Sequence, residues 1–394
     1  MHTERGPRLT VVSRTFPPRA AGSAILLANL LSVYTGAVQA IAGEDQYSPP
    51  DPAFLPPCPT RSLALPFRSP RIYDAVRLRN QAVASRLIQG MMRRTLAAMN
   101  TDVVFAAFPR EDFFVAAFLA ARRLRLPFYA HMHDLWQENM PDGQAARFAA
   151  AWEPRILQQA TRVLCMTEAM QKHYETKYGI QTELLPHSIP EQDYLRAPRE
   201  IVPPRMAKPT MLFVGAVSPA MNLDALRVLA AASELLPPDY ELLFCTATDR
   251  TELQCLGIRS SRLRVTYVSR AEVQRLQSEA HVLVAPLSHK DCSLDEVRTV
   301  FSTKLLEYLI AGRPIVVFAP AESHHATSAL QHGWGYVVTE DSPAALATAL
   351  VKVATDEHLA AELVRRALQE ARSRDARHYA ERLREWVLKD ARQA

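Results

Sequence analysis

Residues 281–320 read HVLVAPLSHKDCSLDEVRTVFSTKLLEYLIAGRPIVVFAP and contain the pattern that decides the fold. The order is a buried apolar strand, a long polar loop, the start of a helix, a turn with Gly and Pro, and a second buried strand. Continuous apolar strands joined through a helix are typical of parallel sheets covered on both faces. We therefore expect an α/β fold in this part of the chain.

The same alternation of strands and helices runs through the rest of the sequence. In the first half we predict strands at 9–13, 37–42, 102–108, 126–134, 161–167 and 182–188, with helices at 23–33, 73–99, 111–124 and 168–179. In the second half we predict strands at 210–216, 240–247, 264–269, 281–287, 314–320 and 335–340, followed by three helical stretches. Residues 44–70 hold eight Pro and are predicted to be irregular.

These patterns predict two domains. Residues 1–188 form an N-terminal Rossmann-like domain, and residues 189–209, with many Pro and charges, form a linker. Residues 210–375 form a second Rossmann-like domain, and residues 376–394 form a C-terminal helix that can pack back on the first domain. We expect the two parallel sheets to face a central cleft, because ligands bind at the carboxyl ends of strands in open α/β sheets.

Composition narrows the class of protein. The chain has 394 residues, of which 48% are hydrophobic and 22% charged, as in folded soluble proteins. Its five cysteines are scattered, so we expect neither a disulfide framework nor a zinc site, and a cytoplasmic location. Residues 20–43 carry no charge and could span a membrane, but their polar residues favour a helix, a turn and a strand.

Positive charge is concentrated in the first half. Residues 60–127 carry twelve Arg and four acidic residues, whereas the whole chain has a net charge of +5. We expect an anionic partner, such as phospholipid headgroups or a phosphorylated acceptor, and not nucleic acid. The basic helix at 73–99 would fit peripheral contact with the inner face of a membrane. The alternative is an Arg-rich face that is simply solvated.

The helix that starts near residue 303 is a candidate anion site. Ser302 and Thr303 suit an N-cap, and the free amides of Thr303, Lys304 and Leu305 would add to the charge of Lys304. Glu307 follows one turn later and could accept two ribose hydroxyls. The alternative is ordinary capping with a surface pair between Lys304 and Glu307.

This stretch also resembles a family signature. STKLLEYLIAGRPIV (302–316) is similar to the xxKLxEYLxxGxPV motif of retaining glycosyltransferases of the GT-B fold, in the family 4-like group 1. Further matches follow the expected order and cover nearly the whole chain: PPRAAGS (17–23), FYAHMHDLWQEN (128–139), RVLCMTEAMQKHYETKYG (162–179), LLPHSIP (184–190) and FVGAVSPAMNLDAL (213–226). The resemblance implies two Rossmann-like domains and a nucleotide-sugar substrate.

The resemblance also implies roles for residues of the second domain. Family members use two Glu residues toward the donor, and Glu307 matches the one that contacts the ribose. The position of the other Glu, which contacts the sugar in the family, is occupied here by Thr299. Arg298 or Glu296 could reach the sugar in its place. The family's Arg and Lys after the first strand of this domain are absent, although Gly215 is present. The phosphates would therefore depend on the donor-binding group, which is Ser302, Thr303, Lys304 and Leu305, with Arg298 or Arg14 in support.

In the first domain the resemblance points to the end of a buried strand. His133 would contact the donor sugar or its phosphate, and His131 lies on the same face of the strand because side chains alternate. Asp134 and His131, with Arg14, are candidates for the acceptor side. Gly22 would let backbone amides approach the donor closely.

The reaction implied is the transfer of a sugar from a nucleoside diphosphate, UDP or GDP, to a hydroxyl of a glycan, a lipid-linked saccharide or a small molecule. We expect retention at the anomeric carbon, no metal, no cofactor and closure of the two domains. Two alternatives stay open: a sugar-nucleotide epimerase, which would need no acceptor, and an inactive nucleotide- or glycan-binding partner protein. Thr299 and the missing basic pair favour the inactive protein.

Overall fold

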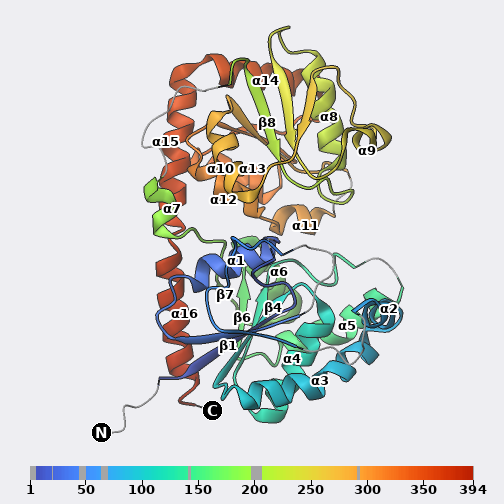
Figure 1. The fold of residues 1–394 in the computed structure, drawn as a ribbon, viewed down its shortest axis with the longest axis vertical. Helices are drawn as coiled ribbons and strands as arrows, with labels where there is room; N and C mark the ends of the chain where they lie inside the picture. Colours follow the sequence, from blue (N-terminus) through green and yellow to red (C-terminus); the bar gives the residue numbers. More distant parts are fainter. Residues whose placement is uncertain are drawn as a thin grey trace. The chain divides into compact units, whose positions relative to one another are not determined.

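The computed structural model describes residues 6–19, 21–43, 50–63, 70–140, 143–196, 206–290 and 293–393. The chain divides into two compact units (Figure 1). The N-terminal unit comprises Met1–Pro190 with Asp375–Ala394, and the C-terminal unit comprises Glu191–Arg374. The last helix of the chain therefore belongs by its contacts to the first unit.

The N-terminal unit is built on a seven-stranded sheet with the order β3-β2-β1-β4-β5-β6-β7. Every neighbouring pair is parallel. The strands are β1 (Arg8–Ser13), β2 (Ala37–Ala42), β3 (Thr60–Ser62), β4 (Val103–Phe108), β5 (Phe128–Met132), β6 (Arg162–Cys165) and β7 (Glu183–Leu184). The direction of winding reverses between β1 and β4, so a switch point lies between them.

Helices cover both faces of this sheet. They are α1 (Gly22–Leu31), α2 (Pro70–Arg79), α3 (Gln81–Ala98), α4 (Glu111–Leu124), α5 (Gln144–Leu157), α6 (Glu168–Tyr178) and α16 (Ala376–Asp390). One core contains side chains of α3, α4, α5 and α6, and a second core on the other face contains side chains of α1 and α16. Parallel strands buried on both faces explain the continuous apolar runs in the sequence.

The last helix is tied to the sheet by polar contacts as well as by packing. Tyr129 on β5 donates its hydroxyl to Asp390 at 2.6 Å, and Arg162 on β6 makes an ion pair with the same carboxylate at 2.6 Å. The amide of Ala376 donates to the carbonyl of Ile189, so both ends of α16 are fixed to this unit.

Two local predictions for this unit were wrong, and one helix was missed. The Pro-rich stretch contains a short edge strand, β3, which pairs with β2. The helix predicted at 73–99 is two helices, because Asn80 adopts an extended conformation and caps α3 through the amide of Val83. Helix α5 was not predicted; Pro154 lies inside it, and Pro usually argues against a helix.

The C-terminal unit is built on a six-stranded parallel sheet with the order β10-β9-β8-β11-β12-β13. The strands are β8 (Thr210–Val214), β9 (Glu241–Cys245), β10 (Leu263–Thr266), β11 (Val282–Pro286), β12 (Ile315–Phe318) and β13 (Tyr336–Val338). Here the winding reverses between β8 and β11, which places a second switch point at the carboxyl ends of these strands.

Its helices surround the sheet in the usual α/β manner. They are α7 (Glu191–Arg196), α8 (Leu223–Glu234), α9 (Arg250–Cys255), α10 (Arg270–Glu279), α11 (Leu294–Thr299), α12 (Thr303–Ile310), α13 (His324–His332), α14 (Pro343–Thr355) and α15 (Glu357–Ser373). Two short ones correct the sequence analysis: α7 lies in the predicted linker, and α11 lies in the predicted polar loop before α12.

The uncharged stretch near the N-terminus is divided between α1 and β2, which are ten and six residues long. In the part of the chain that the structure describes, no helix has both the length and the apolar character needed to cross a bilayer.

Candidate functional site

Helix α12 starts at the switch point of the C-terminal unit. Ser302 is its N-cap, but the serine hydroxyl makes no capping bond, and the serine amide donates to Nε2 of His325 at 3.0 Å. The amide of Leu305 donates to the carbonyl of Ser302 at 3.1 Å. Among the described residues, no acceptor takes the amides of Thr303 and Lys304. Two amides are therefore open at this helix start, and the expectation for Leu305 was wrong.

Lys304 adds a charge beside these amides. Its side chain is half-buried, and Nζ lies 5.8 Å from the centre of the Phe213 ring on β8. Within the described residues, Nζ makes no hydrogen bond and no ion pair. Burial lowers the pKa of Lys304, and the nearby charge of Glu307 opposes that shift in part. A cation held without a partner at this place can stabilise an anionic ligand.

Gly215, which directly follows β8, makes room for this lysine. A Cβ at Gly215 would lie 1.9 Å from Lys304 Nζ and 2.5 Å from Cε. Only a residue without a side chain lets the lysine lie across this backbone. Gly215 therefore acts on the site through the position of Lys304.

Glu307 lies one turn after Lys304 and is half-buried. Gln277, a buried residue on α10, donates its side-chain amide to Glu307 Oε2 at 3.3 Å. This contact fixes the carboxylate on the same helix as the open amides and the lysine.

The two candidates on α11 differ from each other in accessibility. Thr299 is buried, and its hydroxyl donates to the carbonyl of Asp295 at 2.8 Å in its own helix. This placement argues against the sugar-binding role expected of Thr299. Arg298 is exposed on the same helix and remains a candidate.

In the N-terminal unit, His133 and His131 belong to a chain of hydrogen bonds that starts at helix α1. Ser23 Oγ lies 3.0 Å from Nδ1 of His133, and Nε2 of His133 lies 2.9 Å from Nδ1 of His131. Nε2 of His131 lies 3.1 Å from the carbonyl oxygen of Leu185. All three contacts are within hydrogen-bond distance.

The direction of this chain follows from chemistry. Burial lowers the pKa of His131 to about 4 and that of His133 well below its usual value, so both rings are neutral. The Leu185 carbonyl can only accept, so His131 carries its proton on Nε2 and accepts at Nδ1 from His133. His133 in turn accepts from the hydroxyl of Ser23. Both nitrogens of both rings therefore have partners within the protein, which argues against the expected direct contact of His133 and His131 with substrate.

Ser23 is the group that this chain presents to a ligand. It is the second residue of α1, is half-buried, and follows β1 at the switch point. With its proton directed to His133, its oxygen can accept from a ligand hydroxyl. The sequence analysis missed Ser23, although a hydroxyl directly after Gly22 was a usable signal. Gly22 itself is exposed as the first residue of α1, which has no side-chain cap.

A Ser23→Ala substitution tests this chain. We expect kcat/KM for the sugar acceptor or donor to fall about fivefold, because a typical hydrogen bond contributes about 1 kcal/mol. Ser23→Thr should restore most of the activity. The ring-nitrogen chemical shifts of His133 should change in Ser23→Ala, and unchanged shifts would contradict the assigned direction. Ser32→Ala, at the other end of α1, is the matched control.

Asp134 follows the histidines and has a different environment. It is half-buried and makes no hydrogen bond with any described residue, and desolvation raises its pKa to about 6. A carboxyl group with a raised pKa and no internal partner is a candidate for ligand contact.

Arg14 is not available to a ligand, which corrects its expected role. Its side chain is 1% exposed and makes ion pairs with Asp74 at 2.6 Å and Asp112 at 3.4 Å. Tyr73 also donates its hydroxyl to Asp112. The guanidinium is thus part of an internal network that joins β1 to α2 and α4.

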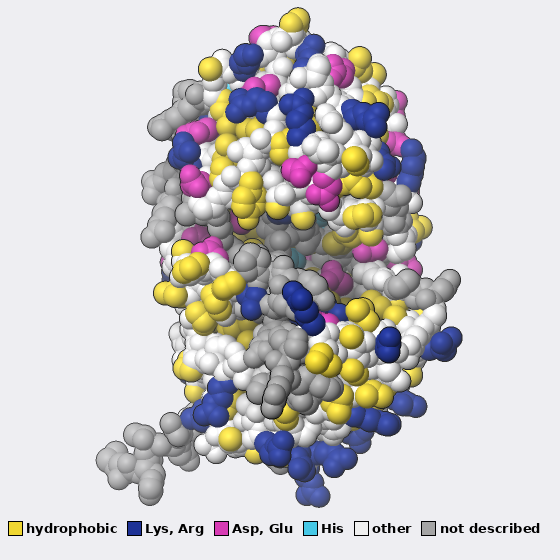
Figure 2. Space-filling model, turned by 45° about the vertical axis from the view of Figure 1, so that its right-hand side comes forward, with side chains coloured by type: hydrophobic (Ala, Val, Ile, Leu, Met, Phe, Trp, Pro, Cys, Tyr) yellow, Lys and Arg dark blue, Asp and Glu magenta, His cyan; other side chains and the backbone are white. Residues whose placement is uncertain are grey.

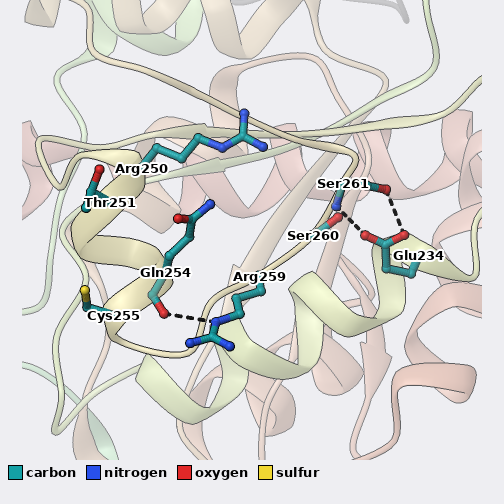
Figure 3. Close-up of a pocket in the computed structure, with 8 residues that line it drawn as sticks. All are labelled: Glu234, Arg250, Thr251, Gln254, Cys255, Arg259, Ser260 and Ser261. Atoms are coloured by element: carbon teal, nitrogen blue, oxygen red, sulfur yellow. Dashed lines mark hydrogen bonds between the residues drawn. The ribbon is translucent and has the colours of Figure 1, made fainter.

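A separate surface pocket lies at the end of α8 and along α9 (Figure 3). Its lining contains none of the predicted site residues. Glu234 accepts the amide and the hydroxyl of Ser261, and Arg259 donates to the carbonyl of Gln254. Because Glu234 and Arg259 are engaged in these internal bonds and none of the site candidates lines this pocket, we assign it no role.

The two parallel sheets with their switch points, together with an open cationic helix start, define a protein of the GT-B fold class. The family comparison agrees. Residues 10–186 match the glycosyl transferase 4-like domain, and residues 208–356 match the glycosyl transferases group 1. The chain belongs to this glycosyltransferase family and is an enzyme of the transferase class.

Solved structures show the same fold at low sequence identity. Anabaena HepE in complex with UDP and glucose has a TM-score of 0.67 and 15% identity, with 97% of this chain and 99% of that chain covered. Sucrose-phosphate synthase from Thermosynechococcus elongatus has a TM-score of 0.67, 16% identity, and coverage of 97% and 98%. A trehalose-phosphate synthase from Burkholderia vietnamiensis has a TM-score of 0.66, 13% identity, and coverage of 98% and 100%. A search of curated proteins finds no match.

Proposed function

We propose that this glycosyltransferase moves a sugar from a UDP-sugar to a hydroxyl acceptor with retention of anomeric configuration. The observation that carries the proposal is the start of α12, where Lys304, whose ammonium makes no hydrogen bond or ion pair with any described residue, lies beside the open amides of Thr303 and Lys304. Cleavage of the sugar–phosphate bond leaves negative charge on the departing diphosphate. Preorganised donors and a helix N-terminus stabilise such charge as it develops.

The ammonium and the helix start can supply the positive charge that a metal ion supplies elsewhere, so we propose that the reaction needs no metal and no cofactor. The nucleotide sugar is then a substrate. Glu307 would accept hydroxyls of the ribose, as acidic residues do in other nucleotide sites. Arg298, exposed on α11, would be free to approach the diphosphate.

UDP is the nucleotide that the similar structures favour. Anabaena HepE was solved with UDP-glucose, and the trehalose-phosphate synthase is described as UDP-forming. For the acceptor we propose a glycan, a lipid-linked saccharide or a small molecule on the N-terminal unit, near Ser23 and Asp134. We place the protein in the cytoplasm, with peripheral contact with an anionic membrane.

Binding of nucleotides tests this proposal before any acceptor is known. UDP should raise the melting temperature more than GDP does, because a ligand that binds only the folded state stabilises it. In Glu307→Ala the dissociation constant of UDP should rise about 10- to 100-fold, since hydrogen bonds to charged groups contribute about 1.5–3 kcal/mol. Glu307→Gln, which can still accept from Gln277, separates loss of charge from loss of packing.

Glu322→Ala is the matched control, because Glu322 is an exposed carboxylate of the same unit. Equal UDP binding in Glu307→Ala and Glu322→Ala would contradict the ribose role. Once an acceptor supports turnover, the anomeric configuration of the product by NMR decides between retention and inversion. UDP binding without transfer to any acceptor would favour the inactive binding protein, and an epimerised donor would favour the epimerase.

A further inference from the structure

Helices α2 and α3 have an outer surface of unusual composition. The exposed residues of α3 recur at helical spacing along one stripe: Val83, Arg86, Leu87, Gly90, Arg93, Arg94, Ala97 and Ala98. Those of α2 are Arg71, Ile72, Ala75, Leu78 and Arg79. Every one of them is Arg, Gly or an apolar residue. A solvated helix face normally carries acidic and amide side chains as well.

The apolar members of this surface are large and well exposed. Leu78 is 71% exposed, Ile72 is 51% exposed, and Val83 and Leu87 are each more than 40% exposed. Single exposed hydrophobic residues are ordinary, but a group of them on two consecutive helices indicates an interaction surface.

The positive charge continues onto the neighbouring helices. Arg122 and Arg123 are exposed on α4, which packs against α3, and Arg147 and Arg155 are exposed on α5. The carboxylates of α2, α4 and α5 are all buried: Asp74, Glu111, Asp112 and Glu153. Figure 2 shows Lys and Arg side chains gathered among hydrophobic ones at the lower end of the view, where acidic side chains are scarce.

A surface pocket of about 410 Å³ lies within this region. Its lining is Arg86 and Gln89 of α3, Leu119, Arg122 and Arg123 of α4, and Trp152 of α5. Three guanidinium groups around one hollow suit a phosphate, because Arg forms paired hydrogen bonds with phosphate oxygens. Trp, like Tyr, is enriched at membrane–water interfaces.

We infer that the peripheral membrane contact proposed above, on which this inference rests, is made by the outer surface of α2 and α3 with the arginine pocket, and that this surface docks on an anionic lipid bilayer. Arginines would meet lipid phosphates while Ile72, Leu78 and Leu87 enter the headgroup region. A second copy of the chain fits less well, since arginines would face arginines with no exposed carboxylate opposite. A soluble polyanion would use the arginines but would leave the aliphatic side chains exposed to water.

Vesicle flotation with the full chain tests this inference. Wild-type protein should float with phosphatidylcholine vesicles that contain phosphatidylglycerol, and much less with phosphatidylcholine alone. Changing Arg86, Arg122 and Arg123 together to Gln should weaken binding roughly 100-fold, because each basic residue near an anionic surface contributes about a fivefold factor. The matched control changes Arg250, Arg259 and Arg275, which are exposed in the C-terminal unit, to Gln.

The apolar contribution needs its own variant. Ile72→Ser with Leu78→Ser should weaken vesicle binding about tenfold and should make the remainder more sensitive to salt. Full binding by this variant, together with complete competition by heparin, would overturn the membrane assignment in favour of a polyanion surface. If the arginine variant bound vesicles as tightly as the wild-type protein does, the membrane assignment would be overturned entirely. UDP binding should be unchanged in every variant, so these results are independent of the proposed reaction.

Discussion

Replacing Lys304 with Met should lower donor turnover about 100- to 1,000-fold, as loss of one preorganised donor to a developing anion does in other enzymes. The same change should leave the fold intact. Met keeps most of the length of the aliphatic side chain and removes the charge that lies over the Phe213 ring. Loss of activity without loss of structure is therefore the expected result.

The stability of Lys304→Met gives a second readout with a defined sign. The folded-state pKa of Lys304 is lowered, so a charged lysine at this place destabilises the free protein at neutral pH. That cost is fully present below the lowered pKa, shrinks as the pH rises from there toward the ordinary lysine pKa, and is gone above the ordinary value. We therefore expect Lys304→Met to be as stable as the wild type or more stable near pH 7, with the difference shrinking at alkaline pH.

Lys352→Met is the matched control for Lys304→Met. Lys352 also lies over an aromatic ring, that of Tyr336 at 5.3 Å, but it is exposed on α14. Its loss should change neither turnover nor UDP binding. Turnover in Lys304→Met equal to that of the control would contradict the diphosphate role of the lysine. A Gly215→Ala variant should imitate Lys304→Met in part, because the new Cβ displaces the ammonium.

Replacing Arg14 with Met should lower the free energy of unfolding by about 3–5 kcal/mol, the usual cost of leaving a buried charge without its partner. Asp112 is fully buried, and without Arg14 the hydroxyl of Tyr73 would be its one remaining side-chain partner among the residues that the structure describes. Asp74 would keep Arg77 at 3.4 Å. Chemical denaturation measures this loss.

Adding Asp112→Asn should restore part of the stability lost in Arg14→Met, because the amide removes the uncompensated charge. Arg71→Met, on the exposed side of α2, is the control and should change stability by less than about 0.5 kcal/mol. A loss in Arg14→Met as small as in this control would mean that the carboxylates find other partners. UDP binding should survive in any folded Arg14→Met protein, since Arg14 does not reach a ligand.

The sequence predicted the regular parts of the fold because they follow from local patterns. Apolar strands, a threonine before α6 and a glycine after it each specify structure within a few residues. Gly179 adopts the positive φ of a helix C-cap, at 64°, as its position after α6 predicted. Helix α5 could not be predicted in this way, because its internal Pro154 argues against a helix. The burial of its apolar side chains, which depends on the rest of the unit, favours the helix instead.

Site residues were harder to assign because their partners are distant in sequence. The alternation of side chains along β5 placed His131 and His133 on one face, and the centres of their rings do lie 4.4 Å apart. That their nitrogens are all occupied depends on Ser23 and on the Leu185 carbonyl, which no local pattern reveals. The burial of Arg14 likewise depends on Asp74 and Asp112, which are 60 and 98 residues away.

The attachment of α16 to the first sheet has a consequence for biosynthesis. The ribosome makes this helix only after the whole of Glu191–Arg374. The apolar surface that α16 covers, beside α1 on the first sheet, therefore stays exposed to solvent while the second unit is synthesised. Apolar surface exposed for that long invites aggregation and chaperone binding. Nascent chains should therefore acquire protease resistance in their first half late, when Asp390 reaches Tyr129 and Arg162.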